Sequence, residues 1–130
     1  MHPSFIALNL ALIATLTALG SLAAESAALT QVKQDGRIRL GMYLGFEGLS
    51  FIQKGERLGL EVEMAKLVCQ ELSKDLGQDI QPEIVSQEWA QIIQELRNGK
   101  YHAAFSAVIP AALYAHYNVG YTQSYLDTGP

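Results

Sequence analysis

Residues 60–86 read LEVEMAKLVCQELSKDLGQDIQPEIVS, a helical pattern followed by a strand pattern. The apolar side chains of the first part recur at helical spacing: Leu60, Met64, Leu67, Val68, Leu72 and Leu76. Gly77 stands where a helix C-terminal cap belongs, so a helix over 60–76 is predicted. The following DIQPEIVS predicts a short strand. Pro82 marks its start or an edge, because proline cannot donate to a strand ladder.

Further strands and helices are expected on both sides of this stretch. RIRLGMYL, at 37–44, alternates charged and apolar residues and predicts a strand. Three glycines follow within a dozen residues and predict an irregular loop: Gly45, Gly48 and Gly55. A second helix is expected over 88–98. Its inward side chains are Ile92, Ile93 and Leu96, and Gly99 ends it.

The last third of the chain carries little charge. YHAAFSAVI, at 101–109, predicts a buried strand that Pro110 ends. AALYAHYN, at 111–118, is compatible with one or two helical turns, and VGYTQSYL, at 119–126, with a loop or a strand. The order β-α-β-α-β predicts an α/β fold, with a mostly parallel sheet and helices on its faces.

The N-terminus has the pattern of an export signal. Residues 5–24 read FIALNLALIATLTALGSLAA without a charge and end in small side chains, which indicates a signal peptide over 1–24 cleaved after Ala23 or Ala24. An uncleaved membrane anchor is the alternative, because the run approaches the ~20 residues that span a bilayer. A polar linker is expected over 25–35, and the folded part over 36–130.

Composition narrows the classes of function. The chain has 130 residues, enough for one small domain, and a net charge of −4, which argues against nucleic-acid binding. Cys69 is the only cysteine, so an intrachain disulfide is impossible, and its apolar neighbours predict an inert buried thiol.

No catalytic, metal or cofactor motif emerges from the residue pattern. His102 and His116 lie fourteen positions apart without a carboxylate at ligand spacing. The glycines do not form a phosphate loop, and Ser106 lacks a nucleophile elbow. Glu61 and Glu63 are interpreted as the solvated start of the first helix, where the helix dipole favours carboxylates. No catalytic residue, metal ligand or cofactor is therefore predicted.

Several pieces taken in order resemble the family 3 periplasmic solute-binding proteins, the binding components of ABC importers for amino acids and related small polar solutes. These pieces are RIRLGMYLGFEGLSF, GERLGLEVEMAKLV, WAQIIQELRNGKYHAAFSAV and YTQSYLDTG. The match covers about 31–130. Glu61 and Glu63 stand where the family has aspartates, Gln94 where it has proline, and His102 where it has aspartate.

The resemblance implies a two-lobed clamp that closes on a solute. The family's aromatic positions, which flank the ligand, fall on Phe46 and Trp89. An aromatic ring offers a large contact area and attracts an ammonium or guanidinium group. For Trp89 the alternative is that it continues the apolar face formed by the second helix.

One departure concerns the arginine that binds the ligand's α-carboxylate in the family. Its position falls on Tyr114 or Ala115, and neither side chain replaces a guanidinium fork. Ser106 and Ala107 remain able to offer backbone groups. The expected ligand-binding residues are thus Phe46, Trp89, Ser106, Ala107 and Tyr114, and an ordinary amino-acid specificity is in question.

A second departure is length, since the chain stops where the family crosses toward its second lobe. The resemblance therefore implies an incomplete first lobe: a fragment, a truncated gene product or a protein with another partner. The leading hypothesis is a periplasmic solute-binding protein without catalysis, with an importer permease as a further partner.

Two alternatives stay open. One is an enzyme on this fold, such as a cyclic-acid dehydratase using His102, His116, Glu47 or Glu88. The other is a sensory or interaction module held at the membrane by its N-terminus.

Overall fold

The computed structural model of the chain describes residues 26–109 and 116–126. Two compact units are distinguished, Met1–Thr30 and Gln31–Pro130. The helix α2 (Ala27–Asp35) crosses the boundary between them and occupies the stretch where a polar linker was expected. The signal-peptide prediction lies outside the described residues. No helix in the described ranges combines the length and the hydropathy that crossing a membrane requires.

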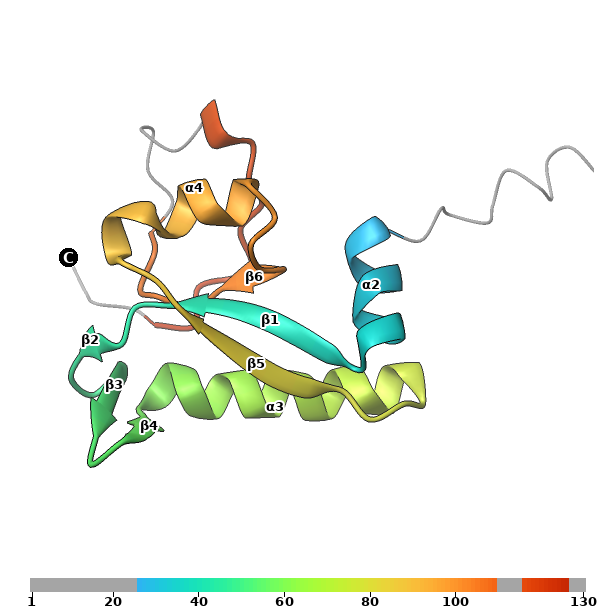
Figure 1. The fold of residues 1–130 in the computed structure, drawn as a ribbon, viewed down its shortest axis with the longest axis horizontal. Helices are drawn as coiled ribbons and strands as arrows, with labels where there is room; N and C mark the ends of the chain where they lie inside the picture. The colour runs from blue at the N-terminus through green and yellow to red at the C-terminus, as the bar shows by residue number, and fades with distance from the viewer. Residues whose placement is uncertain (1–25, 110–115, 127–130) are drawn as a thin grey trace, which may run out of the picture. The chain divides into compact units, whose positions relative to one another are not determined.

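The second unit is built around a three-stranded parallel sheet (Figure 1). Its strands are β1 (Arg37–Met42), β5 (Gln81–Ser86) and β6 (Ala103–Ala104), in the order β5-β1-β6. Leu40, on the central strand, is paired with Ile84 on one side and with Ala103 on the other. The predicted β-α-β-α-β order and parallel sheet are confirmed. Pro82 lies on an edge strand, as its missing amide proton requires.

Helix α3 (Leu60–Leu76) has the bounds that the sequence predicted. Gly77 ends it in the left-handed conformation, with φ 61°, and its amide donates back into the last turn. Val62 and Ala65 pack against Leu40 and Met42 of the central strand. This contact forms the buried core on one side of the sheet.

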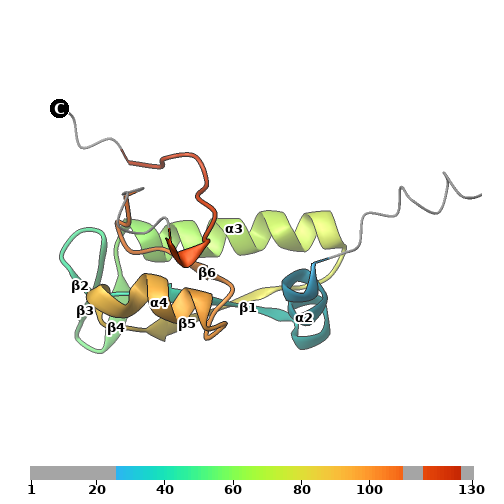
Figure 2. The same ribbon diagram turned by 90° about the horizontal axis from the view of Figure 1, so that it is seen from above.

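The second helix lies on the other side of the sheet (Figure 2). It begins as a 3-10 turn, η1 (Trp89–Gln91), and continues as α4 (Ile92–Arg97). The first crossover runs from β1 to β5, and the second returns past β1 to β6. Because both crossovers are right-handed, the two helices are placed on opposite faces. Ile92 and Ile93 are buried, as predicted.

Two predictions about local structure were wrong. The expected irregular loop is a small antiparallel sheet of β2 (Gly45–Phe46), β3 (Ser50–Gln53) and β4 (Glu56–Leu58). Gly48 and Gly55 take positive φ, which permits the tight returns between these short strands. The strand expected over 101–109 is paired only at Ala103–Ala104, both half-buried, and the backbone has turned away by Ala107, whose φ is 49°.

The described end of the chain, residues 119–126, has no regular structure, in agreement with the loop alternative. The helical turns expected over 111–118 fall largely outside the described residues, as does Pro110.

Candidate functional site

The carboxyl ends of the three parallel strands meet at one edge of the sheet. The loops that leave them are joined by hydrogen bonds to Ser106. The Tyr43 amide, after β1, donates to Ser106 Oγ at 3.0 Å. The indole Nε1–H of Trp89, after β5, donates to the Ser106 carbonyl oxygen at 3.0 Å. In open parallel sheets ligands bind beyond this edge, so these loops form the candidate solute site.

The two predicted aromatic contacts both belong to these loops. Phe46 is half-buried and meets Tyr43 edge to face, with ring centroids 5.1 Å apart and planes at 78°. The Trp89 side chain is 40% exposed even though its indole nitrogen is engaged. Each ring is held by a polar or aromatic contact and keeps part of its surface accessible. Such rings suit a solute with an apolar or cationic side chain.

Ser106 and Ala107 are placed at the same edge, and three of their polar groups are bonded within the protein. Ser106 is 1% exposed, its hydroxyl accepts from Tyr43 and its carbonyl accepts from Trp89. The Ala107 amide donates to Glu61 Oε1 at 2.6 Å. These three bonds shape the loop, and the prediction that the two residues offer backbone groups to a ligand stays a prediction for the Ser106 amide and the Ala107 carbonyl. Tyr114 lies outside the described residues.

Glu61 overturns the interpretation of a solvated helix start. Its side chain is fully buried, and its carboxylate accepts from Ala107, from Ser50 Oγ at 2.6 Å and from the Tyr125 hydroxyl at 2.6 Å. Three donors and the positive end of the α3 dipole compensate the lost hydration of the carboxylate. Glu63 is exposed and paired with Lys66 at 2.6 Å, as the solvated interpretation expects. The resemblance marked Glu61 by placing it on a family aspartate.

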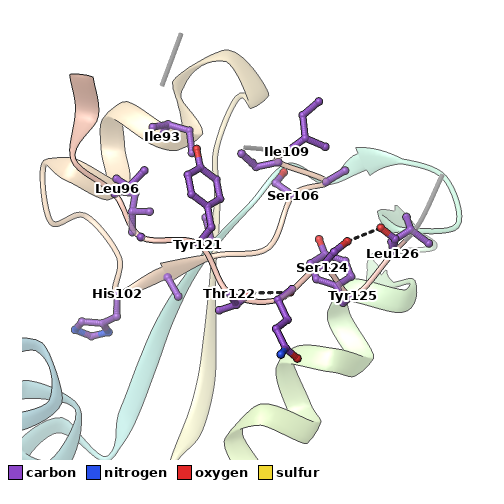
Figure 3. Close-up of a pocket in the computed structure, with 17 residues that line it drawn as sticks. Ile93, Leu96, His102, Ser106, Ile109, Tyr121, Thr122, Ser124, Tyr125 and Leu126 are labelled. Carbon is purple, nitrogen blue, oxygen red and sulfur yellow. Dashed lines mark hydrogen bonds between the residues drawn. The ribbon is translucent and has the colours of Figure 1, made fainter. Parts of the chain in front are cut away.

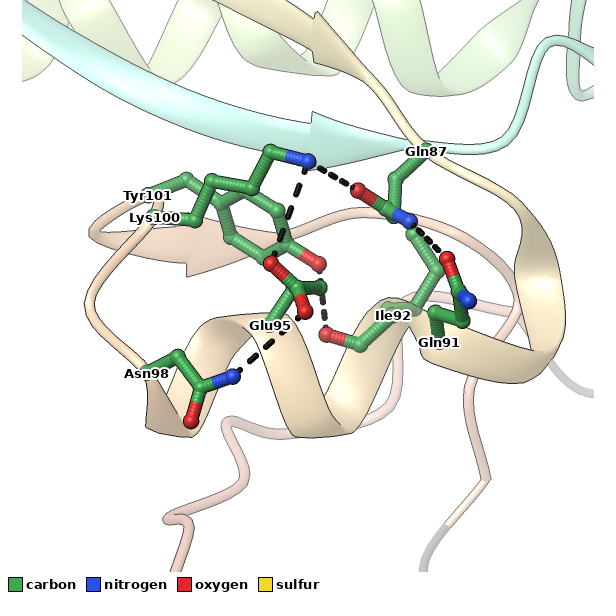
Figure 4. Close-up of polar contacts among 7 residues, drawn as sticks. All are labelled: Gln87, Gln91, Ile92, Glu95, Asn98, Lys100 and Tyr101. Carbon is green, nitrogen blue, oxygen red and sulfur yellow. Dashed lines mark hydrogen bonds and ion pairs between the residues drawn. The ribbon is translucent and has the colours of Figure 1, made fainter.

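A polar cluster supports the loop that carries Trp89 (Figure 4). Lys100 Nζ donates to Gln87 Oε1 at 2.6 Å and lies 3.8 Å from Glu95. Gln87 in turn donates to Gln91 at 2.7 Å, across the start of the 3-10 turn. These contacts fix the end of β5 against the second helix.

Tyr101 anchors the second helix from below. Its hydroxyl donates to the Ile92 carbonyl oxygen, and burial with the nearby charge of Glu95 raises its pKa to about 12. Gly41 lies directly under the ring, and a Cβ there would stand 2.3 Å from Tyr101 Cζ. Glycine is therefore required at this point of the central strand.

Cys69 and His102, which the sequence analysis also considered as functional candidates, are engaged in contacts within the protein. Cys69 is buried, and burial raises the pKa of its thiol, which confirms the inert interpretation. His102 Nδ1 accepts the Arg39 amide at 3.0 Å, and its Nε2 lies 3.3 Å from Gln31 Oε1. No group of three or more potential metal ligands occurs in the described part of the chain.

A cavity of about 410 Å³ adjoins this region and is lined in part by residues 106–109 (Figure 3). Its walls are side chains of α4, strand β6 and the segment 119–126. Of its lining, the sequence had indicated Ser106 and Ala107 as ligand-binding residues and His102 as a candidate acid or base. Neither Phe46 nor Trp89 borders it, so the cavity and the aromatic site are neighbouring but different places.

Comparison with known proteins assigns the fold. The family described as bacterial extracellular solute-binding proteins, family 3, matches residues 38–129. No curated protein matches the sequence. Among solved structures, the ancestral amino acid-binding protein AncCDT-1, a precursor of cyclohexadienyl dehydratase, is 25% identical with a TM-score of 0.59. The alignment covers 68% of this chain and 37% of that chain.

Two further structures are similar over the same region. A second structure of AncCDT-1, described as an ancestral cationic amino acid solute-binding protein, is 27% identical, with a TM-score of 0.55 and coverage of 67% and 36% of the two chains. A variant of the arginine-bound domain 1 from TmArgBP is 24% identical, with a TM-score of 0.64 and coverage of 78% and 74%. The chain thus matches little more than a third of the length of AncCDT-1 and most of an isolated lobe.

Proposed function

Because the chain belongs to family 3 of the bacterial extracellular solute-binding proteins, we propose that it binds a small polar solute outside the cytoplasm for an ABC-type importer. The observation that carries this proposal is the junction of three strand-end loops on Ser106, with Phe46 and Trp89 attached to it. An N-terminal signal peptide over 1–24, cleaved near Ala24, would deliver the chain to the periplasm.

The proposed solute is an amino acid or a related amine. The ancestral protein AncCDT-1, in two structures at 25% and 27% identity, is described as an amino acid binder and as a cationic amino acid binder. A cationic side chain would meet the exposed face of Trp89 favourably. By the family resemblance, the position of the arginine that binds the α-carboxylate falls on Tyr114 or Ala115, which offer no guanidinium. We therefore expect decarboxylated amines to compete better here than with a typical family member.

Isothermal titration of the full chain tests this function. The panel contains arginine, lysine, their amines, neutral amino acids and small organic acids. Trp89→Ala and Phe46→Ala are each expected to lower the affinity for the best solute about tenfold, in line with the loss of one aromatic contact. Ile52→Ala is the control, since Ile52 is exposed on β3. Absence of binding across the panel would reject a receptor role for this chain.

We propose a binding role without catalysis. The competing function is an enzyme, because AncCDT-1 is described as a precursor of cyclohexadienyl dehydratase. Of the four candidate acids and bases, His102 has its Nδ1 occupied by the Arg39 amide, whereas Glu47 and Glu88 are exposed. Turnover of a cyclic carboxylic acid that survives substitution of Trp89 but not of Glu88 would favour the enzyme.

A further inference from the structure

The cavity beside β6 has the dimensions of a ligand site. Its volume of about 410 Å³ falls within the range of small-molecule pockets. Ile93 and Leu96 of α4 form one wall, and Val108 and Ile109 form another. Ala103 and Ala104 form its floor along a strand that has no second strand neighbour in the described sheet. The small floor side chains leave the space open.

The described residues that line the cavity carry no formal charge. None of these seventeen is Asp, Glu, Lys or Arg, and the titratable side chains among them are His102, Tyr121 and Tyr125. The pKa of His102 is lowered by burial and by Arg39, which keeps the ring neutral at neutral pH. A charged ligand would lose its hydration here without gaining a counter-charge. The lining therefore selects uncharged molecules.

Tyr121 provides one polar group inside this apolar space. Figure 3 shows its ring rising from the segment 119–126 between Ile93 and Leu96 on one side and Ser106 and Ile109 on the other. No described residue hydrogen-bonds to its hydroxyl. The neighbouring hydroxyls are satisfied locally, Thr122 by the Gln123 carbonyl at 3.1 Å and Ser124 by the Leu126 carbonyl at 2.7 Å. Among the described lining residues, the Tyr121 hydroxyl and the side-chain amide of Gln123 have no hydrogen-bond partner in the protein, and the Tyr121 hydroxyl lies between the apolar walls.

We infer that this cavity is a second binding site, for a compact uncharged molecule with an aromatic or branched apolar body and one hydrogen-bonding group. The apolar walls hold the body, and the Tyr121 hydroxyl holds the polar group. The cavity shares Ser106 and Ala107 with the loops at the strand ends, but neither Phe46 nor Trp89 borders it. Its occupant would therefore contact a different set of side chains from a solute held by the two aromatic rings.

Three matched probes test the charge selection on the full chain: benzyl alcohol, benzoate and benzylamine. They share one ring and differ in charge. Chemical-shift titration is expected to show benzyl alcohol binding at least about tenfold more tightly than either ion. The shifts should gather on Ala103, Ala104, Val108 and Tyr121 and spare Trp89. Equal affinity for all three probes, or shifts centred on Trp89, would overturn the inference.

Two variants separate this site from the proposed solute site. Ala104→Leu fills the floor and should abolish benzyl alcohol binding while leaving amino-acid binding intact, whereas Trp89→Ala should do the reverse. Tyr121→Phe removes only the free hydroxyl, so it should weaken benzyl alcohol several-fold with an unchanged unfolding midpoint. If Tyr121→Phe and Ala104→Leu both bind benzyl alcohol as the parent does, the cavity is not the site.

Discussion

The hydroxyl of Tyr125 donates a 2.6 Å hydrogen bond to Oε1 of Glu61, a residue 64 positions earlier in the chain. The Tyr125 ring also contacts Phe105, with centroids 6.1 Å apart. Burial, followed by the hydrogen bond and charge of Glu61, raises the pKa of Tyr125 well above its ordinary value of 10. The segment 119–126 is thereby attached to the start of α3, where it closes one side of the cavity.

Removing this hydroxyl should loosen the segment. Tyr125→Phe keeps the ring but deprives a buried carboxylate of one donor, at a cost of about 1–2 kcal/mol in unfolding free energy. Urea unfolding followed by circular dichroism measures the change. Tyr121→Phe is the matched control, since its hydroxyl has no partner among the described residues and its loss should be nearly neutral. Equal effects of the two substitutions would contradict a specific bond to Glu61.

The buried carboxylate itself should matter more. Glu61→Ala removes the acceptor that the Ala107 amide and the Tyr125 hydroxyl share and that Ser50 also contacts. These groups then lose a buried partner, and we expect a loss of about 2–4 kcal/mol. Glu63→Ala, two residues along the same helix, breaks only an exposed pair with Lys66 and should cost less than about 0.5 kcal/mol. Thermal unfolding of both variants tests the contrast.

His102 predicts a dependence of stability on pH. Its pKa is lowered below 6.5, first by burial and then by Arg39, although Asp35 and Glu83 act in the opposite direction. The unfolded chain then binds the proton more tightly, so the contribution of His102 is complete above pH 6.5 and is lost as the pH falls through the lower folded pKa. Protonation also removes the Nδ1 acceptor of the Arg39 amide.

The test compares urea midpoints of the parent and His102→Gln at pH 8 and pH 5. Other carboxylates contribute to acid sensitivity in both proteins, so the informative quantity is the difference between the two falls. The parent should lose more stability on acidification than the variant. An identical fall in both would show that His102 does not titrate in this window.

The order of strands and helices could be predicted because it depends on local patterns. The spacing that predicted α3 and the glycine that ends it act within a few residues, and both were correct. The length of the strand predicted over 101–109 was overestimated, because the sequence is as apolar where the chain pairs with β1 as where it turns away from the sheet. At Ala107 the backbone leaves the sheet with a positive φ, and the sequence has no glycine there that would have indicated it.

The candidate site could be predicted only in part, since it depends on contacts between distant segments. Phe46 and Trp89 were named through family positions, and their loops do meet at Ser106. The burial of Glu61 needed Ser50 and Tyr125, which lie 11 and 64 positions away, and no periodicity connects them. Local spacing describes a helix face but not the partners that cover it.

The buried and the exposed faces of helix α3 can be compared by substitution. Val62 is 2% exposed in the core beside Leu40, whereas Leu67, part of the apolar pattern that predicted the helix, is 59% exposed. Val62→Ala should lower the unfolding free energy by about 1–3 kcal/mol, because it removes buried methyl groups and leaves a cavity. Leu67→Ala should stay within about 0.5 kcal/mol, since little area is buried and alanine favours the helix. Urea unfolding of the two variants side by side measures both. A loss at Leu67 as large as that at Val62 would mean that the outer face of α3 is covered in the folded protein.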